Sequence, residues 1–290
     1  MSTARRIRRR IRAAVVAGSV SALLLGALTT TANATQPNSE TDAFEIGNHA
    51  MGSQIAKVEG DDSSPSTAAA MRPQGVGADG MKAQATVAGI DVASHQSNVD
   101  WDYWWGQGKR FAYVKATEAT SYTNPYFAQQ YIGSYDIGMI RGAYHFAVPN
   151  SSSGRAQANY FVDNGGGWSG DGKTLPGALD MEYNPYGSDP CYGMNQAQMG
   201  SWIRDFHDTY RSRTGRSPVI YTSTSWWNKC VGWAQTFGDT VPLWVARYSD
   251  SVGRLPNGWG YHTFWQYTSS PLDQNSFNGT YDRLQALANG

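Results

Sequence analysis

Two acidic residues, Asp180 and Glu182, stand two positions apart in the run 178–183. Along a β-strand this spacing points both side chains to one face, with Leu179 and Met181 on the opposite, packed face. Cleavage of a glycosidic bond needs two such carboxyls, one protonated to supply a proton to the leaving oxygen and one ionised to support the developing positive charge. The spacing alone is also typical of two solvated acids or of a metal site, so its meaning depends on the rest of the chain.

Further acids follow other runs that we predict to be strands. Asp91 ends the run 87–92, Glu118 follows the run 111–115, and Asp273 comes after the last predicted strand. In a barrel of parallel strands the C-terminal strand ends form the active-site face. Carboxyls gathered there repel one another and lose water, which raises some of their pKa values. We therefore expect several of these acids to converge on one site.

Aromatic residues make up 13% of the chain and supply a second feature of a carbohydrate site. Sugar rings present C–H faces that pack on indole rings. For any single tryptophan the alternative, that it fills the core, is the stronger one, but the set together with the acids favours a sugar-binding cleft. The tryptophans concerned stand near predicted strand ends: Trp101, Trp104, Trp105, Trp226, Trp227, Trp244 and Trp265.

Other catalytic schemes lack their sequence signatures. No histidine pair has metal-ligand spacing such as H-E-x-x-H, and no G-x-S-x-G motif or phosphate-binding glycine loop occurs. We predict no metal site and no cofactor. His145 is expected to be a strand-end histidine whose hydrogen bonds are satisfied within the fold.

The elements that must position these residues alternate between strand and helix. Seven strands are predicted at 87–92, 111–115, 140–146, 177–183, 218–222, 243–248 and 263–268. Helices are predicted at 101–108, 125–136, 154–164 and 195–213, the last capped by Asn195 and ending at Gly215. Strands separated by helices indicate parallel βαβ units. Because the helices shorten or vanish after Tyr221, we predict an α/β fold: an irregular, TIM-like β/α barrel whose final strands lack regular helices.

The N-terminal part of the chain differs in composition from the rest. Residues 1–34 combine six arginines, a short apolar run and an Ala-x-Ala site, which predicts a cleaved secretory signal peptide rather than a membrane anchor. Residues 35–86 contain one aromatic, Phe44, and are predicted to be a flexible linker or a propeptide. Residues 87–290 are long enough for one catalytic domain.

Charge and cysteine content indicate which partners and which cellular compartment to expect. Loss of residues 1–34 leaves 17 basic and 23 acidic residues, a net charge of −6, which argues against a nucleic-acid partner. The two cysteines, Cys191 and Cys230, would form one disulfide in an oxidising compartment. No Cys–His signature favours a catalytic thiol. We expect a secreted, extracellular or wall-associated monomer that does not contact the membrane after signal cleavage.

The motifs, taken in order, resemble the family 25 glycoside hydrolases, the CH-type muramidases. The matching segments span nearly all of residues 87–290: 89–96, 114–118, 142–146, 179–182, 265–267 and 272–275. The resemblance implies hydrolysis of the β-1,4 bond between N-acetylmuramic acid and N-acetylglucosamine in the glycan strands of peptidoglycan. It also implies an irregular β/α barrel.

Site roles come from the same resemblance. Glu182 corresponds to the general acid/base, and Asp180 to a partner that is either a nucleophile or an orienting group for the substrate's acetamido. By the same resemblance, Asp91 and Asp273 are the acids that complete the cluster. The residues that line the groove are Tyr144, Glu118, Tyr221, Trp244 and Gln266.

Two other functions remain open. A chitinase-like hydrolase would use a D-x-D-x-E run, but Ala178 stands where its first acid belongs. A non-catalytic glycan-binding barrel would keep the aromatics and need none of the acids.

Overall fold

Eight strands of the described chain close into a barrel. The computed structural model describes residues 47–61, 85–238 and 240–290. Around the barrel the order is β1, β9, β8, β7, β6, β5, β4 and β2, and β2 pairs back with β1. Their bounds are β1 (Val87–Val92), β2 (Phe111–Glu118), β4 (Ile140–Phe146), β5 (Ala178–Asp180), β6 (Val219–Ser223), β7 (Leu243–Ala246), β8 (Phe264–Thr268) and β9 (Gln274–Phe277).

The barrel is parallel except at one strand. β9 runs antiparallel to both of its neighbours, β1 and β8, while the other pairs around the barrel are parallel. A short strand, β3 (Tyr122–Thr123), pairs with β2 outside the barrel. The seven predicted strands are confirmed, and the irregular α/β barrel with them. The strands β3 and β9 were not predicted.

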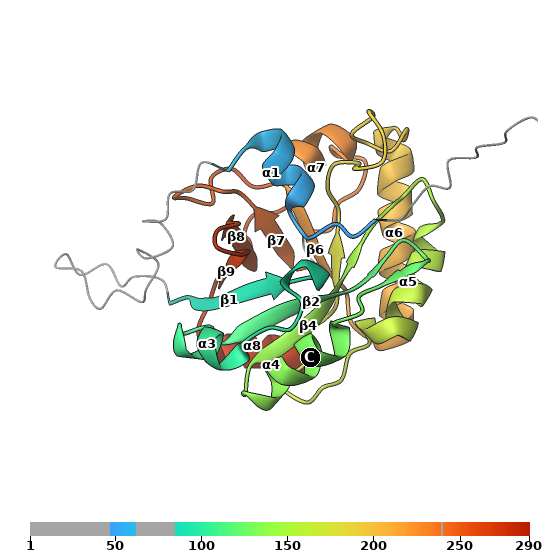
Figure 1. Cartoon of the computed structure of the whole chain (residues 1–290). Coiled ribbons are helices and arrows are strands. Elements are labelled where there is room, and N and C mark those ends of the chain that lie inside the picture. The colour runs from blue at the N-terminus through green and yellow to red at the C-terminus, as the bar shows by residue number, and fades with distance from the viewer. Residues whose placement is uncertain (1–46, 62–84, 239) are drawn as a thin grey trace, which may run out of the picture. The chain divides into compact units, whose positions relative to one another are not determined.

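Helices surround the first half of the barrel more fully than the second (Figure 1). The four predicted helices are present, with α6 capped by Asn195 and ended by Gly215 in the left-handed region at φ 77°. After β6 the described connections carry one short helix, α7, and α8 follows β9; neither was predicted. The helices are α1 (Ser53–Glu59), α3 (Trp101–Gly106), α4 (Phe127–Asp136), α5 (Gly154–Phe161), α6 (Gln196–Thr214), α7 (Thr224–Cys230) and α8 (Tyr281–Asn289).

Large aromatic side chains fill the barrel. The ring of Tyr113 lies 4.7 Å from that of Trp244 and 5.7 Å from that of Phe264, centroid to centroid. Trp226, Trp227 and Trp244 are all 0% exposed. For these three tryptophans the core-filling alternative holds.

Residues 47–61 lie in the stretch predicted to be a flexible linker or a propeptide, and they contain a helix. They are ordered against the barrel, with α1 lying beside β6, β7 and α7 (Figure 1). Met51 and Ile55 are each 1% exposed. Two buried apolar side chains and many polar contacts hold this segment on the barrel. The predicted signal peptide (1–34) and the remainder of 35–86 lie outside the described residues, among which no helix has both the length and the apolarity to span a bilayer.

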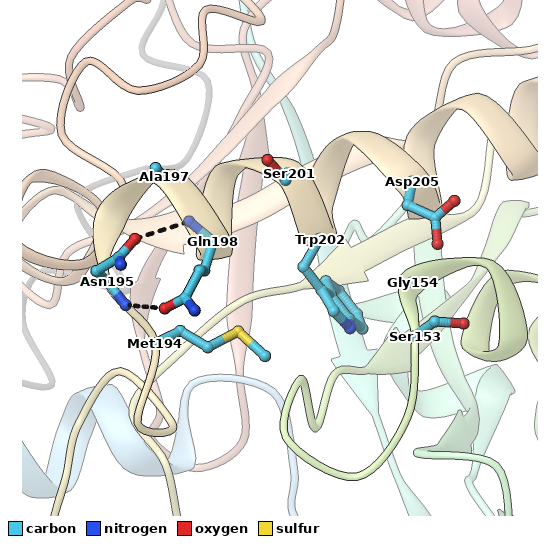
Figure 2. A pocket seen from close by; sticks show the side chains of 9 residues that line it. All are labelled: Ser153, Gly154, Met194, Asn195, Ala197, Gln198, Ser201, Trp202 and Asp205. Atoms are coloured by element: carbon cyan, nitrogen blue, oxygen red, sulfur yellow. Dashed lines mark hydrogen bonds between the residues drawn. The ribbon is translucent and has the colours of Figure 1, made fainter.

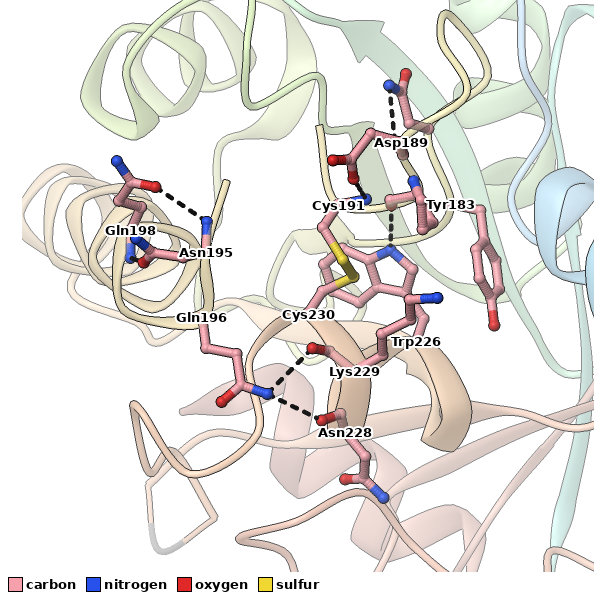
Figure 3. Close-up of a disulfide and its surroundings, with 12 residues drawn as sticks. Tyr183, Asp189, Cys191, Asn195, Gln196, Gln198, Trp226, Asn228, Lys229 and Cys230 are labelled. Carbon is pink, nitrogen blue, oxygen red and sulfur yellow. Dashed lines mark hydrogen bonds between the residues drawn. A yellow bond between two sulfur atoms is a disulfide. The ribbon is translucent and has the colours of Figure 1, made fainter. Parts of the chain in front are cut away.

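The predicted disulfide is present. Cys191, in the loop after β5, is bonded to Cys230 at the end of α7, and their Cα atoms lie 5.4 Å apart (Figure 3). The Asp189 carboxylate accepts the Cys191 N–H at 2.7 Å, and the Trp226 indole donates to the Pro190 carbonyl at 3.0 Å. The disulfide therefore links the loop that follows the acidic pair to α7, the helix that follows β6.

Candidate active site

The four acids predicted to form a cluster lie at one end of the barrel, two at the adjacent strands β1 and β9 and two at the end of β5, across the barrel from them. Asp91 is in β1, Asp180 ends β5, Glu182 follows two residues later and Asp273 directly precedes β9. The Asp91 N–H donates to the Asp273 carbonyl at 3.3 Å. Each side chain is buried, and each feels the charge of at least one other member. The structure thus brings all four together.

The strand beneath the acidic pair is shorter than predicted. β5 ends at Asp180, where its pairing with Phe146 of β4 and Tyr221 of β6 stops. Glu182 therefore stands beyond the strand rather than within it. Leu179 and Met181 are fully buried, as expected for the packed side of the pair.

Asp91 is held by two side-chain amides. Gln266 Nε2 and Asn275 Nδ2 both donate to Asp91 Oδ2, at 2.9 and 2.7 Å. The amide oxygens are occupied elsewhere. Gln266 Oε1 accepts the hydroxyls of Tyr221 and Tyr248 at 2.6 and 2.8 Å. Because the oxygens are taken, the NH₂ groups must face the carboxylate, so the network fixes both amides in a donating orientation.

Trp244 and Tyr144, two predicted groove residues, are both fully buried in this structure. Trp244 lies behind Asn275 and donates to its Oδ1 at 3.0 Å. The Tyr144 hydroxyl accepts the N–H of Met51 at 3.1 Å. Trp244 therefore acts on the cluster through Asn275, whereas Tyr144 faces the segment that contains α1.

Burial dominates the protonation of the acids. It raises the pKa of Asp180 well above its ordinary range, and the nearby Glu182 charge raises it further. Burial also raises the pKa of Glu182 against the opposing effect of three backbone N–H donors, and it raises that of Asp273. A hydrogen bond with the Asp180 carboxyl acts in the same direction as these donors and lowers the pKa of Glu182. The cluster therefore keeps some of its protons at neutral pH, as an acid/base pair requires.

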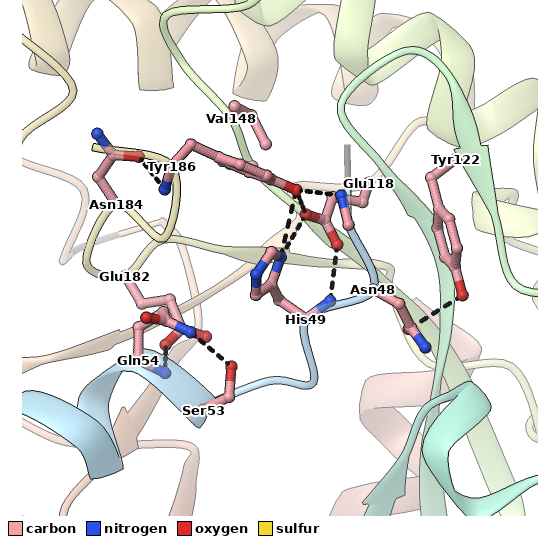
Figure 4. A network of polar contacts seen from close by, with 12 residues as sticks. Asn48, His49, Ser53, Gln54, Glu118, Tyr122, Val148, Glu182, Asn184 and Tyr186 are labelled. Carbon is pink, nitrogen blue, oxygen red and sulfur yellow. Dashed lines mark hydrogen bonds and ion pairs between the residues drawn. The ribbon is translucent and has the colours of Figure 1, made fainter. Parts of the chain in front are cut away.

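Glu118 belongs to an adjoining network (Figure 4). Its carboxylate forms a fully buried ion pair with Lys115 and accepts hydrogen bonds from the N–H of His49 at 3.1 Å and from the Tyr186 hydroxyl. Burial acts to raise the pKa of Glu118, but the hydrogen bond with His49 and the Lys115 charge outweigh it and lower the pKa. The Lys115 charge also acts on Asp180.

Comparison with known proteins identifies the fold's family. The profile described as "Glycosyl hydrolases family 25" matches residues 90–275. Lysozyme M1 of Streptomyces globisporus is 49% identical over 211 residues, 70% of this chain and 71% of that protein. An N,O-diacetylmuramidase of Arthroderma benhamiae is 46% identical over 208 residues, 71% of this chain and 88% of that protein. A solved structure of a muramidase from Acremonium alcalophilum is 54% identical with a TM-score of 0.69, covering 70% of this chain and 99% of that one.

The chain belongs to glycosyl hydrolase family 25. It is therefore a glycoside hydrolase.

The site also contains residues that were not predicted from the sequence. These are Lys115, Tyr186, Tyr248 and Asn275. Lys115 had a detectable signal, a lysine inside an apolar strand run three residues before Glu118. The Tyr186 and Tyr248 hydroxyls gave none, because each reaches the site from a position that only the closed barrel defines.

Two other features of the family 25 barrel, within the described residues, form no hydrogen bond with the four acids. His145 is fully buried and bonds to Thr117 and Gln157 at 2.7 and 2.9 Å, as predicted for a satisfied histidine. No cluster of potential metal ligands occurs among the described residues. A shallow hollow between the starts of α5 and α6 shares no lining residue with the acids (Figure 2); it is lined by Ser153, Gly154, Met194, Asn195, Ala197, Gln198, Ser201, Trp202 and Asp205.

Proposed function

We propose that this family 25 hydrolase is a muramidase that cleaves the β-1,4 bond between N-acetylmuramic acid and N-acetylglucosamine in peptidoglycan. The observation that carries the proposal is the buried pair Asp180 and Glu182, whose pKa values are both raised, at the C-terminal end of a barrel strand. Relatives named lysozyme and N,O-diacetylmuramidase support the substrate class.

In the proposed reaction, Glu182 gives its proton to the glycosidic oxygen as the bond to the anomeric carbon breaks. Asp180 either attacks that carbon or orients the 2-acetamido group to attack it. Glu182, now ionised, takes a proton from water, whose oxygen displaces the covalent or cyclic intermediate and restores the acid. Asp91 and Asp273 support positive charge at the sugar ring.

We propose that the remaining predicted residues bind the substrate or position the acids. Tyr144, Tyr221 and Gln266 present hydroxyl and amide groups around the cluster, and Glu118 lies at one end of the groove. Trp244 holds Asn275, which in turn orients Asp91. These roles are proposed from the contacts described above.

The setting is proposed along with the reaction. We propose that residues 1–34 direct export, that the chain from residue 87 onward is the catalytic domain, and that it acts as a monomer on peptidoglycan glycan strands outside the cell. Sugar binding without bond cleavage and chitinase activity are the competing functions.

The test uses residues 85–290, which hold every barrel strand and match the extent of the solved muramidase chain. Purified peptidoglycan is digested, and the new reducing ends are converted with borohydride and identified by mass. Muramitol is expected, with at least a roughly hundredfold loss of turnover for Glu182→Gln and normal turnover for the exposed control Asp136→Asn. Glucosaminitol, activity on chitin alone, or an active Glu182→Gln variant would each overturn the proposal.

A further inference from the structure

We infer that residues 47–61, here called the cleft segment, keep the intact chain inactive by occupying the active site. The inference rests on the proposed function. Its central observation is the surroundings of Glu182, which accepts three backbone N–H groups from the N-cap and first turn of α1. Glu182 Oε1 accepts the Gly52 N–H at 2.8 Å, and Oε2 accepts those of Gln54 and Ile55 at 2.8 and 3.1 Å.

The contacts continue along the groove on one side of Glu182. The Met51 N–H donates to the Tyr144 hydroxyl, and the Tyr122 hydroxyl donates to Asn48 at 3.0 Å. His49 bonds to Glu118 through both its backbone N–H and its ring, at 3.1 and 2.8 Å (Figure 4). The segment thus binds residues that we propose to contact the sugar strand.

The contacts also continue on the other side. Glu59, at the end of α1, accepts hydrogen bonds from the hydroxyls of Tyr183 at 3.0 Å and of Ser223. Asp61 accepts the Ser269 N–H at 3.2 Å. Because the contacts run past Glu182 in both directions, the segment crosses the whole site instead of touching one side of it.

Gly52 shows that a sugar and the segment cannot share the site. A Cβ built on Gly52 would lie 2.0 Å from the Tyr248 hydroxyl, 2.5 Å from that of Tyr221 and 2.6 Å from Gln266 Oε1. The backbone therefore approaches these groups so closely that not even a methyl group fits between them. The Tyr248 hydroxyl lies 3.1 Å from the Gly52 carbonyl as well.

The hydrogen-bonding positions around the Glu182 carboxyl are occupied as well. Donation of a proton by Glu182 requires one of its oxygens to carry that proton and to face the glycosidic oxygen. In the intact chain both oxygens instead accept backbone N–H groups, so neither is directed at a glycosidic oxygen. Burial still raises the pKa of Glu182 against the effect of these donors. The segment thus competes for the acid's hydrogen-bonding capacity in addition to occupying space.

Covalent linkage to the barrel strengthens inhibition by the cleft segment. Residues 61 and 85 belong to one chain, so the local concentration of the segment at the groove is on the order of millimolar. Once the link is broken, the same contacts must hold a free peptide against dilution. The inhibition is therefore expected to end when the segment is separated from the barrel.

The test replaces Gly52 in the full chain. Gly52→Leu places a side chain where the site has no room and at φ 78°, which disfavours any side chain. The matched control is Gly60→Leu, also at a positive φ, 86°, but with nothing within 4 Å of its Cβ. We expect wild type and Gly60→Leu to show less than about 1% of the muramidase activity of residues 85–290. Gly52→Leu should regain at least tenfold.

A second measurement does not depend on catalysis. Amide hydrogen exchange at residues 52, 54 and 55 should be slow in wild type and in Gly60→Leu, and fast in Gly52→Leu. A synthetic peptide of residues 44–61 should inhibit residues 85–290 when added separately, and the same peptide with Gly52→Leu should not.

The outcomes separate the two proposals. Equal activity of the full chain and residues 85–290 would overturn the inference while leaving the proposed function standing. Inactive residues 85–290 would overturn the proposed function, and exchange would then decide the inference alone. Fast exchange at residues 52, 54 and 55 in wild type would overturn it.

Discussion

Replacing Asp91 by asparagine should stabilise the protein at neutral pH. Burial raises the pKa of Asp91 from 3.8 to about 7, although Asn275 and Gln266 act to lower it. Both amides donate to Oδ2, and Oδ1 has no partner. In Asp91→Asn the side-chain oxygen can take the place of Oδ2 and the NH₂ group that of Oδ1, so no hydrogen bond is lost and the cost of ionising a buried carboxyl disappears.

The sign and size follow from proton linkage. The pKa of an unfolded aspartate is near 3.8, so between that value and about 7 the folded state binds a proton that the unfolded state lacks. Wild type therefore loses about 1.4 kcal/mol per pH unit across this interval, at most about 4 kcal/mol in total. Relaxation and the neighbouring acids reduce this, so we expect Asp91→Asn to gain about 2–4 kcal/mol above pH 7 and nothing near pH 4.

His145 makes the comparison of two proteins necessary. Burial lowers its pKa to about 4, so it destabilises the fold as the pH falls from 6.5 towards 4. This opposes the effect of Asp91 in the same window, and the wild-type profile alone would show their sum. Because His145 is present in both proteins, the difference between the profiles isolates Asp91.

The assay is thermal and urea unfolding of the full chain and its Asp91→Asn variant from pH 4 to pH 8. A rise in Tm of roughly 5–15 °C is expected at pH 7.5, with lower muramidase activity in residues 85–290 carrying the same change. The exposed control Asp136→Asn should shift stability by less than about 0.5 kcal/mol at every pH. A flat difference profile, or a less stable Asp91→Asn at pH 7.5, would mean that the amides from Gln266 and Asn275 outweigh burial.

Two further changes test how the disulfide and the packing of α5 on α6 stabilise the fold around the site. Replacing Cys191 and Cys230 together by alanine should lower the free energy of unfolding by up to about 4 kcal/mol, because the bond closes a separation of 39 residues, and urea titration measures the loss. A disulfide-free protein of unchanged stability would contradict this. Gly154→Ala should cost about 1–3 kcal/mol, since its Cβ would meet the Trp202 carbonyl oxygen at 2.3 Å where α5 packs on α6. Gly106→Ala, with nothing within 4 Å, is the neutral control, and equal melting temperatures for the two variants would refute the packing argument.

Runs of β-branched and aromatic residues were sufficient to predict the barrel but not its closure. β9 reads Gln274-Asn275-Ser276-Phe277, with no apolar alternation, yet all four residues are buried. Its polar side chains find partners inside the barrel, as Asn275 does with Asp91 and Trp244. Such a strand is stabilised by contacts from residues far away in the chain, so local periodicity cannot reveal it.

The acids could be predicted because their positions follow from chain topology. Strand ends of parallel βαβ units meet on one face, so Asp91, Asp180 and Glu182 could be grouped before any coordinates were considered. The hydrogen-bond partners of individual tryptophans could not. Trp244 and Trp265 both follow strand patterns and both are buried, but the indole of Trp244 donates to Asn275 beside the acids and that of Trp265 donates to the Arg247 carbonyl.

The chemistry of the cluster also explains why the composition of residues 35–86 left both a flexible linker and a propeptide open and did not indicate where the cleft segment binds. Among the described residues Asp180 has no hydrogen-bond donor other than the neighbouring Glu182, and Lys115, whose charge acts on both Asp180 and Glu182, already pairs with Glu118. Buried carboxyls with spare acceptor capacity favour any ligand that brings donors without a titrating proton. A sugar does so with hydroxyl and acetamido groups, and a peptide does so with its backbone N–H groups. Because backbone donors are common to every sequence, a segment that binds through them needs few apolar residues, and its composition cannot distinguish it from a linker.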